Sequence, residues 1–385
     1  NFQLQNIYFP RDIAGSLAST AMANYKISVP SEEQLEYFLN YLFRKDKLWD
    51  GQHDGISRVL SGKDVLLLLP TGSGKSLVYQ LASLLLPGKT IVVDPIIALM
   101  EDQVDNLSFY GIDRCITITN QVENPLDRSY LMQLFAQGEY LFTFIAPERF
   151  QSKEFRDALR TLTVHSPISM IVIDEAHCVS EWGHDFRTAY LNIGRTSREY
   201  GKSSGIVPPL LGLTGTASRS VLKDAQRELQ ITDFDAIITP PSFDRPELSF
   251  GVITSKSDEK QARLKGHLGQ KLPQLLKVSS SSLFQTRGEK TFSGLVFFPH
   301  VGGNFGVVEN TNELAGELGV PIEFYSGGTP KHWNGGGFLE YKRRVATDFK
   351  RNRTPLLFTT KAFGMGIDKP NIRYTIHFGI PNSIE

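Results

Sequence analysis

The chain has 385 residues, with 41 lysines and arginines against 41 aspartates and glutamates, and 41% of its residues are hydrophobic. This length exceeds one ordinary hydrophobic core and favours two domains, and the composition excludes a disordered or fibrous chain. A formal net charge of zero argues against a uniformly basic surface for nucleic acid, although a local basic groove is compatible with it.

The cysteine count and the chain ends indicate the compartment. Cys115 and Cys178 are too few for a disulfide framework or a cysteine-built zinc site. No stretch approaches the ~20 apolar residues that span a bilayer, and the start lacks a signal-peptide pattern. We expect an intracellular protein without a membrane partner, cytoplasmic in a bacterium or nuclear in a eukaryote. Because the first residue is not Met, we also expect a piece of a longer protein.

Residues 1–47 read as an N-terminal extension that contains one helix. Pro30 and a Ser31/Gln34 capping box mark its start. Apolar residues at helical spacing follow, namely Leu35, Phe38, Leu39 and Leu42.

The pattern of apolar runs in residues 48–241 predicts an α/β domain with a parallel sheet. The apolar runs "DVLLLLP", "TIVVDP", "YLFTFIAP", "MIVIDE" and "PLLGLTGT" are separated by segments of helix length. Residues 292–385 repeat the alternation in "SGLVFFPH", "PIEFYS", "PLLFTT" and "YTIHFG". Between the domains, residues 242–291 are expected to form a linker and insertion, with an amphipathic helix followed by a mobile loop around Ser279 to Ser282.

A glycine-rich stretch, "LLLLPTGSGKSLVYQ", stands between an expected strand and an expected helix. Gly72 and Gly74 allow successive N–H groups to point at one anion, where Lys75 can reach a terminal phosphate and Ser76 can offer a hydroxyl to magnesium. The strict phosphate-loop pattern has glycine in place of Leu69, so the match is partial. The alternative is a chance Gly-Ser turn with an exposed lysine.

The stretch "VIDEAHCVSEWGHDFR" follows the expected strand "MIVID". Open parallel sheets bind ligands at the carboxyl ends of their strands. There Asp174 can hold magnesium through water, and Glu175 can polarise an attacking water. Together with Lys75 these carboxylates predict phosphoryl-transfer chemistry, and the alternative is a solvated Asp-Glu pair at a strand end.

The stretches "LPTGSGKS", "DEAH", "LTGTAS" and "FGMGIDKP" resemble the motifs of superfamily 2 helicases, and "DEAHCVSEWGHDFR" resembles the RecQ family in particular. The segments "DPIIALMEDQVDNL", "FIAPERF" and "SFDRPELSF" agree in order. The resemblance implies two tandem RecA-like domains, each a mainly parallel sheet flanked by helices. It also implies ATP and Mg²⁺ as cofactors.

The aromatic stretch after "DEAH" is the predicted contact with DNA. The resemblance implies that Trp182, His184, Phe186 and Arg187 sense single-stranded DNA and couple it to hydrolysis. Trp and Phe can in any case stack on bases of any identity, while arginine can meet phosphate. The alternative is one packed helix face, because Trp182 and Phe186 are four residues apart.

The resemblance also implies a connection between the nucleotide site and the stretch "LTGTAS". His177 would link the nucleotide site to "LTGTAS", where Thr214 and Thr216 join hydrolysis to domain movement; a core histidine bonded to a strand end is the alternative. The family more often has alanine in place of Gly212 and Gly215, which predicts a looser loop.

Gln52 and Trp49 are the candidates for contact with the base of the nucleotide. The resemblance assigns adenine recognition to Gln52, since an amide can both donate to and accept from the base edge. Trp49 stands where the family usually has arginine, and it either stacks on the base or packs beneath the loop.

In the second domain, Gly364, Gly366 and Asp368 belong to "FGMGIDKP", and the resemblance implies that this segment faces the nucleotide. The run "YKRRVATDFKRNR" has six basic residues against one acid, and it either lines a groove for a DNA strand or forms a solvated helix face. Family members continue after "IPNSIE" with an arginine-bearing Q-x-x-G-R-x-G-R segment. Because the chain stops at Glu385, we expect it to bind nucleotide and hydrolyse it weakly.

The predicted function is an ATP-dependent 3′–5′ DNA helicase core that acts on single-stranded and forked DNA, with the polarity implied by the resemblance alone. The alternatives are a translocase or RNA-directed remodeller that does not unwind, and a nucleotide-gated DNA-binding module that does not turn over. No protein partner is predicted. The candidate residues are Lys75, Asp174, Glu175 and His177 for catalysis; Gln52, Thr71, Gly72, Ser73, Gly74, Lys75, Ser76, Gly366 and Asp368 for the nucleotide; Ser76 and Asp174 for Mg²⁺; Trp182, His184, Phe186 and Arg187 for DNA; and Thr214 and Thr216 for coupling.

Overall fold

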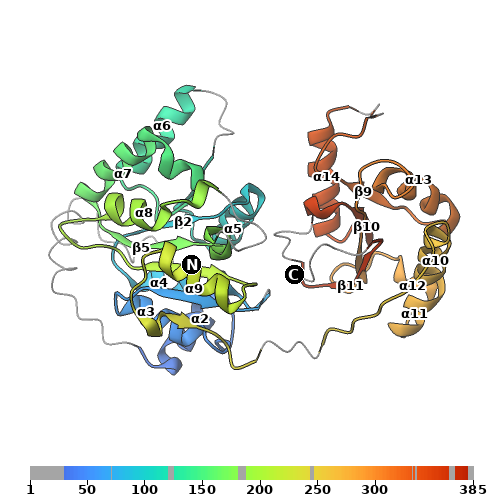
Figure 1. Ribbon diagram of the computed structural model, residues 1–385, viewed down its shortest axis with the longest axis horizontal. Coiled ribbons are helices and arrows are strands. Elements are labelled where there is room, and N and C mark those ends of the chain that lie inside the picture. Colours follow the sequence, from blue (N-terminus) through green and yellow to red (C-terminus); the bar gives the residue numbers. More distant parts are fainter. Residues whose placement is uncertain are drawn as a thin grey trace. The chain divides into compact units, whose positions relative to one another are not determined.

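The computed structural model describes residues 30–70, 72–119, 125–180, 188–242, 247–331, 333, 336–363 and 369–379. The chain divides into two compact units, Asn1–Arg245 and Pro246–Glu385 (Figure 1). Across the described ranges, no helix is both long and apolar enough to cross a membrane.

The first unit is built on a sheet of seven strands within the described residues, in the order β3-β4-β2-β5-β6-β1-β7. Every pairing of these strands is parallel, which confirms the predicted fold class. The short strands β3 and β7 have no counterpart in the expected apolar runs. The strands are β1 (Val65–Leu68), β2 (Lys89–Val93), β3 (Cys115–Ile118), β4 (Phe142–Ile145), β5 (Ile168–Ile173), β6 (Leu210–Thr214) and β7 (Ile237–Ile238).

Helices cover both faces of this sheet (Figure 1). Val65 and Leu67 of β1 pack into one hydrophobic cluster, and Leu66 and Leu68 pack into the other. Both faces are therefore buried, which explains why the strands read as continuous apolar runs. The first cluster takes residues from α2 (Glu32–Phe43), α3 (Gln52–Leu60), α4 (Lys75–Leu85) and α5 (Ile97–Phe109), and the second from α6 (Pro125–Ala136), α7 (Lys153–His165), α8 (Ile193–Gly201) and α9 (Arg219–Glu228).

The start of α2 confirms the predicted capping box. The Ser31 side chain accepts a hydrogen bond from the Gln34 N–H, and the Gln34 side chain accepts one from the Ser31 N–H. The buried stripe is Leu35, Leu39 and Phe43, whereas Phe38, expected on this face, is exposed.

The second unit contains a smaller parallel sheet, with the order β11-β8-β10-β9 in the described part of the chain. Its strands, β8 (Ser293–Phe297), β9 (Glu323–Tyr325), β10 (Leu356–Thr359) and β11 (Ile372–His377), match the four predicted apolar runs. The sheet packs between α13 (Val307–Leu318) on one face and α14 (Phe338–Lys350) on the other.

The expected linker and insertion contributes helices to the second unit. Lys260–Leu283 forms α10 (Lys260–Gly266), a π-helical turn (His267–Lys271), α11 (Leu272–Leu275) and α12 (Ser280–Leu283). Leu264, Leu268 and Leu272 join the core with α13, as an amphipathic helix should. The serine run forms the helical turn α12 where a mobile loop was expected, because the Ser279 side chain caps the Ser282 N–H and Leu283 is buried.

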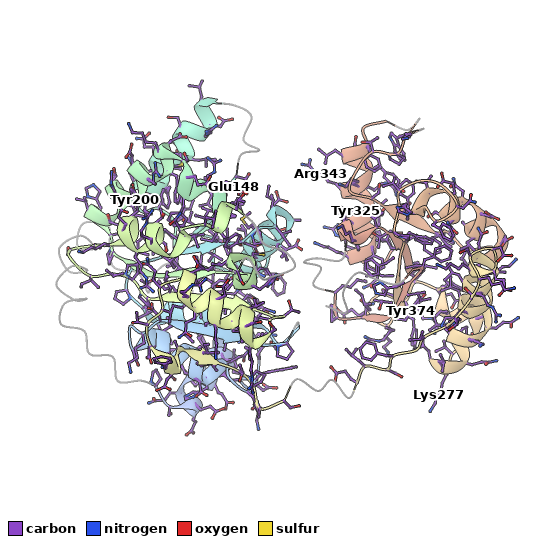
Figure 2. The ribbon with its side chains drawn as sticks, in the orientation of Figure 1. Glu148, Tyr200, Lys277, Tyr325, Arg343 and Tyr374 are labelled. Carbon is purple, nitrogen blue, oxygen red and sulfur yellow. The ribbon has the colours of Figure 1, made fainter. Side chains whose placement is uncertain are left out.

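A close contact between neighbouring strands fixes a glycine in the second sheet. Tyr374 of β11 pairs with Gly294 of β8, and the Tyr374 ring lies over that glycine (Figure 2 labels Tyr374). A Cβ at position 294 would lie 2.0 Å from Tyr374 Cζ. The sheet therefore needs a residue without a side chain at this position.

We expect Gly294→Ala to destabilise the second unit by about 1–3 kcal/mol, because the buried Tyr374 ring must move. Gly316→Ala is the matched control, since position 316 in α13 has open space for a Cβ and alanine is the better helix former. The control should stabilise the unit by about 0.5–1 kcal/mol. Urea unfolding of both variants measures the two shifts, and a Gly294→Ala protein as stable as the wild type would contradict the ring contact.

A buried lysine holds the chain directly after residues 364–368, which lie outside the described residues. Lys369 is 7% exposed, and its Nζ donates to the Lys350 carbonyl and to the Asn352 side chain. The Asn371 amide donates to the same Asn352 oxygen, and the ammonium lies 5.0 Å from the Phe349 ring centre. Burial lowers the pKa of Lys369 to about 8.

This lowered pKa predicts a pH-dependent stability difference between the wild type and Lys369→Met. In the unfolded chain a lysine titrates at its ordinary value of about 10.4, so between pH 8 and 10.4 the unfolded state binds more protons than the folded state. As the pH rises from about 8 to about 10.4, the stability of the wild type relative to Lys369→Met should therefore increase, and below about pH 8 it should stay at its lowest value. A difference in urea midpoint that does not change with pH would contradict the burial of the charge.

Candidate nucleotide-binding site

The phosphate loop connects β1 to α4, as predicted. Gly72 and Gly74 have φ angles of 83° and 72°, which glycine adopts without strain. Helix α4 begins at Lys75, and its N-cap Gly74 offers no side chain to the first N–H groups. These donors and the helix dipole suit an anion. Thr71, a predicted nucleotide-binding residue, lies outside the described residues.

Leu69 explains why the glycine pattern is incomplete. Its side chain is buried in the first hydrophobic cluster. A Cβ placed on Gly51 would lie 3.1 Å from Leu69 Cδ2, so this leucine packs directly beneath the turn before α3. Position 69 is therefore a packed side chain, and among the described loop residues Gly72 and Gly74 have the positive φ angles that curve the chain.

The sheet brings the acidic strand end to the same edge as the phosphate loop. Strand β6 lies between β1 and β5, with Leu68 opposite Thr214 and Ile173 opposite Gly212. Because all three strands are parallel, their carboxyl ends share one edge. Lys75 and Asp174, separated by a hundred residues in the sequence, both follow strands that end there.

Asp174 lies in an environment that suits a cation. Its Oδ1 accepts a hydrogen bond of 2.9 Å from the Glu175 N–H. Burial and the neighbouring Glu175 carboxylate raise the pKa of Asp174 to about 6, while Lys75 and His177 oppose this rise. Lys75 is among the charges that lower the pKa of Asp174, and both residues follow strands that end at the same sheet edge.

The oxygen donors fit Mg²⁺. In the described part of the chain, no group of three or more His, Cys, Asp or Glu side chains could hold a metal alone. Mg²⁺ needs no such group, because it is usually held by one or two protein oxygens with water and substrate phosphates. The Ser76 hydroxyl and the Asp174 carboxylate are oxygens of this kind. Burial and Glu175 raise the pKa of Asp174, and a divalent ion beside it would stabilise its ionised form.

A hydrogen-bonded network joins the acidic strand end to the end of β6. His177 Nδ1 lies 2.9 Å from the Thr214 hydroxyl and 3.3 Å from Glu175 Oε2. The Thr214 hydroxyl donates to the Thr216 carbonyl, so it must accept from His177, and Nδ1 carries the proton. Glu175 itself has a positive φ of 48°. The structure thus brings together His177, Thr214 and Thr216, whose coupling role remains a prediction.

Gly212 is in a tightly packed strand. A Cβ at this position would lie 2.7 Å from Leu66 Cδ1 and 3.4 Å from Ala176 Cβ. The expectation of looseness therefore does not hold at Gly212, because the side chains of β1 and of the turn after β5 already fill the space that an alanine would need.

The predicted DNA-sensing residues Trp182, His184, Phe186 and Arg187 lie outside the described residues. The chain on either side of them is held in place. Ser180 donates a 2.7 Å hydrogen bond to Asp224 of α9, and the buried Tyr190 hydroxyl donates to the Asp174 carbonyl at 3.1 Å. No pattern in the sequence pointed to Tyr190, because this bond depends on the tertiary fold.

One further residue that the sequence analysis missed is affected by the carboxylate of Asp174. The buried Tyr79 of α4 has a pKa raised well above its ordinary value by burial and by the carboxylates of Asp174 and Asp94. Its hydroxyl donates to Gln103 Oε1 at 3.2 Å. Tyr79 therefore stays neutral, and its ring packs in the first hydrophobic cluster beside Phe142 and Phe144.

Gln52 lies against the phosphate loop. Its amide nitrogen donates to the Ser73 and Gly74 carbonyls, and its oxygen accepts from the Trp49 N–H. Reading adenine would require this side chain to exchange these bonds, so that role stays a prediction. Trp49 is an exposed side chain.

In the second unit, Gly364, Gly366 and Asp368 lie outside the described residues. The basic run lies on α14 and the turn after it. Arg344 pairs with Glu323 at 2.9 Å, Arg353 pairs with Asp348 at 3.1 Å, and Lys342 lies 4.9 Å from the Tyr325 ring centre. Arg343 is exposed (Figure 2). Part of this run is thus neutralised within the unit.

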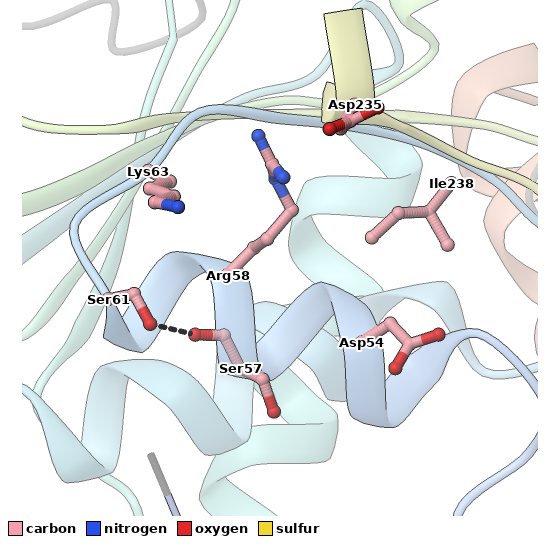
Figure 3. Close-up of a pocket in the computed structure, with 7 residues that line it drawn as sticks. All are labelled: Asp54, Ser57, Arg58, Ser61, Lys63, Asp235 and Ile238. Atoms are coloured by element: carbon pink, nitrogen blue, oxygen red, sulfur yellow. Dashed lines mark hydrogen bonds between the residues drawn. The ribbon is translucent and has the colours of Figure 1, made fainter. Parts of the chain in front are cut away.

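A pocket of about 390 Å³ lies away from the phosphate loop, beside α3 (Figure 3). It mixes cations and carboxylates, and the Arg58 guanidinium is already bonded to Asp233 and to the Asp64 carbonyl. None of the predicted site residues that the structure describes lines it. The lining residues are Asp54, Ser57, Arg58, Ser61, Lys63, Asp235 and Ile238.

Comparison with known proteins gives matches along most of the chain. The family model of the DEAD/DEAH box helicases matches residues 49–225, and that of the helicase conserved C-terminal domain matches residues 290–385. The probable ATP-dependent DNA helicase RecS of Bacillus subtilis is 32% identical over 91% of this chain and 62% of its own length. The ATP-dependent DNA helicase RecQ of Pasteurella multocida is 30% identical over 93% of this chain and 49% of its own length.

Solved structures support the fold. The DEAD-box protein Mss116p, solved with single-stranded RNA and AMP-PNP, superposes with a TM-score of 0.64 at 16% identity, over 97% of this chain and 70% of that one. The DUF1998 helicase MrfA, solved with DNA and AMPPNP, gives 0.63 at 17% identity, over 92% of this chain and 47% of that one. This chain spans about half the length of the curated relatives that it matches. The chain therefore carries a DEAD/DEAH box helicase domain followed by a helicase conserved C-terminal domain, and it is similar to DNA helicases of the RecQ type.

Proposed function

We propose that this chain is the motor of an intracellular ATP-dependent DNA helicase that moves 3′ to 5′ along single-stranded DNA and opens forked duplexes. Hydrolysis of ATP, bound together with Mg²⁺, would drive this movement. The relatives named as DNA helicases support the substrate and the reaction. The polarity and the forked substrate rest on the family resemblance.

The observation that carries the proposal is the shared edge of the parallel sheet, where β1 leads into the phosphate loop and β5 leads into Asp174. Phosphoryl transfer needs positioned cations around the phosphates and a group that orients the attacking water. Lys75 and the N–H groups of α4 would hold the phosphates, and Ser76 and Asp174 would hold Mg²⁺. Glu175, one residue further along, would polarise the water.

Coupling to DNA would pass through the chain around residues 181–187. The Ser180 bond to Asp224 holds the chain before that segment, and the Tyr190 bond to the Asp174 carbonyl holds the chain after it. We propose that DNA stacks on Trp182 and Phe186. On the other side of Asp174, His177 and Thr214 would carry the nucleotide state to the chain after β6.

RNA is a second candidate substrate. A putative ATP-dependent RNA helicase of Acanthamoeba polyphaga mimivirus is 32% identical over 94% of this chain and 58% of its own length. The phosphate chemistry would be the same with either strand. Comparing the stimulation of ATP hydrolysis by single-stranded DNA and RNA of one sequence separates the two, and stronger stimulation by RNA would overturn the DNA assignment.

In the full-length protein, we expect Lys75→Ala and Glu175→Gln each to lower DNA-stimulated ATP hydrolysis at least a hundredfold. Glu175→Gln should keep nucleotide affinity, because the amide still fills the space, whereas Lys75→Ala should weaken it through the lost phosphate contact. Steady-state hydrolysis and nucleotide titration measure the two effects. Lys63→Ala, an exposed lysine of the same unit, is the control and should behave as wild type. Undiminished ATP hydrolysis in either site variant would contradict the assignment of Lys75 and Glu175 to the catalytic site.

We expect Tyr190→Phe to reduce the stimulation of hydrolysis by DNA about fivefold, since it removes one buried hydrogen bond to the Asp174 carbonyl and keeps the ring. Basal hydrolysis without DNA should change less. The control is Tyr200→Phe, because the Tyr200 ring lies 4.5 Å from the Arg160 guanidinium, on the α7 side of the unit. Equal stimulation in both variants would show that the bond carries no coupling.

A further inference from the structure

A polar hollow of about 330 Å³ lies in the first unit, and none of the described phosphate-loop residues lines it. It is bounded by the 3₁₀ turns η2 (Pro147–Gln151) and η4 (Thr188–Tyr190), by the first turn of α7 and by the start of α8. Its lining combines two arginines with hydroxyl and amide groups, and no carboxylate of the described residues lines it. The polar residues of the lining are Gln151, Arg156, Thr188, Asn192, Arg195 and Thr196.

The acids of α7 leave the first of these arginines without an ion pair. Glu154 Oε2 lies 3.3 Å from Arg128 Nη2. Asp157 Oδ1 lies 3.7 Å from Arg160 Nη1. Both carboxylates beside Arg156 in the sequence are therefore paired with other arginines.

The two guanidinium groups of the hollow remain available to a ligand. Neither Arg156 nor Arg195 forms an ion pair with a carboxylate in the described part of the chain. Arg156 contacts an aromatic face, at 5.4 Å from the ring centre of Tyr200, which Figure 2 labels. Arg195 is exposed on α8. Two cations thus line one hollow with no described anion to balance them.

A buried cation adds to this positive charge. Arg149, in η2 directly before two residues that line the hollow, is 3% exposed. It donates to the Thr119 carbonyl, and its Nε has no hydrogen-bond partner among the described residues. Burial and the charge of Arg128 lower the pKa of Arg149, against the effect of Glu154. Because solvent screens a buried charge weakly, Arg149 makes the potential at the neighbouring surface more positive.

This set of donors suits a phosphate group. A guanidinium presents N–H groups in a planar fork that matches two phosphate oxygens, and it stays charged at every ordinary pH. The threonine hydroxyls and the two amides can donate to the oxygens that remain. A carboxylate has two oxygens and one charge, so it would leave part of these donors unused. A phosphate group offers more oxygens and up to two charges.

The hollow shares η4 with the nucleotide site. Thr188 and Ala189 line the hollow. The next residue, Tyr190, donates from its hydroxyl to the Asp174 carbonyl at 3.1 Å. Because η4 is one short turn of three residues, a ligand that moves Thr188 also moves Tyr190.

We propose that this hollow is a second phosphate-binding site, in which Arg156 and Arg195 hold one phosphate group and Tyr190 passes its presence to Asp174. Two sources share this chemistry, namely free orthophosphate and a backbone phosphate of a nucleic-acid strand. Binding of free orthophosphate goes beyond the proposed function, and the nucleic-acid source rests on it.

The probe is orthophosphate at constant ionic strength, on the full-length protein whose phosphate loop is filled with the β,γ-imido analogue of ATP and Mg²⁺. Equilibrium dialysis of radiolabelled orthophosphate measures the binding. We expect one orthophosphate per chain, bound about tenfold or more weakly when Arg156→Gln and Arg195→Gln are combined. Arg156→Lys should lose less, because it keeps the charge without the fork. Arg160→Gln makes the same charge change on α7 outside the hollow, and this control should bind as the wild type does.

Single-stranded DNA then distinguishes the two sources. If the strand supplies the phosphate, DNA displaces orthophosphate, and the slope of log affinity for DNA against log salt concentration becomes shallower by about 0.7 in the double variant. If free phosphate is the ligand, orthophosphate stays bound beside DNA and the slope is unchanged. Either result supports the site, provided that the double variant has lost orthophosphate.

The affinity for the ATP analogue tests the connection to Asp174. Orthophosphate should change this affinity about fivefold in the wild type, beyond the competition at the phosphate loop that the double variant retains. Tyr190→Phe keeps the arginines and lacks the bond to Asp174, so it should bind orthophosphate and lose this extra effect.

Three results would overturn the proposal. The first is a protein with its phosphate loop filled that binds no orthophosphate, and the second is a double variant that binds it as the wild type does. The third is an extra effect on the ATP analogue that persists in Tyr190→Phe, which would overturn the connection through η4. An ATP analogue that does not bind the wild type would instead contradict the proposed function, and the loss of orthophosphate in the double variant would still identify the hollow.

Discussion

The parallel pairing of three strands underlies the whole candidate site. Because β6 pairs with both β1 and β5, the carboxyl ends of these strands meet at one edge. The phosphate loop leaves β1 there, Asp174 follows β5, and Thr214 ends β6. Burial on both sheet faces holds this register, since a slip of one residue would turn every apolar side chain to the other face. The chemistry at the edge therefore depends on packing in the core.

From this edge, side-chain hydrogen bonds extend the site in three directions. Gln52 ties the phosphate loop to the turn before α3. His177 ties the acidic strand end to Thr214. Tyr190 ties the Asp174 carbonyl to the chain that follows residues 181–187. Buried polar bonds of this kind are costly to break, so a ligand that moves one partner must move the other. Such bonds are how a change at the phosphates could reach nucleic acid.

Much of the fold could be predicted from the sequence, because a strand buried on both faces leaves a continuous apolar run that ends at a polar functional residue. Lys75, Asp174 and Glu175 could be named because glycines and carboxylates in that context have few other uses. Strand β3 escaped prediction, since it is short and half-buried at the sheet edge. Tyr190 and the use of the Gln52 amide could not be foreseen, because both depend on residues that are distant in the sequence.

A double-mutant cycle between Ser76→Ala and Asp174→Asn tests the central claim most directly, that Ser76 at the start of α4 and Asp174 at the end of β5 hold one Mg²⁺. The quantity to measure is the gain in ATP-analogue affinity that Mg²⁺ provides. If both oxygens hold the same ion, the second substitution should cost little once the first has been made. Losses that add to within about 0.5 kcal/mol would contradict a shared ion, and with it the joining of the two halves of the site.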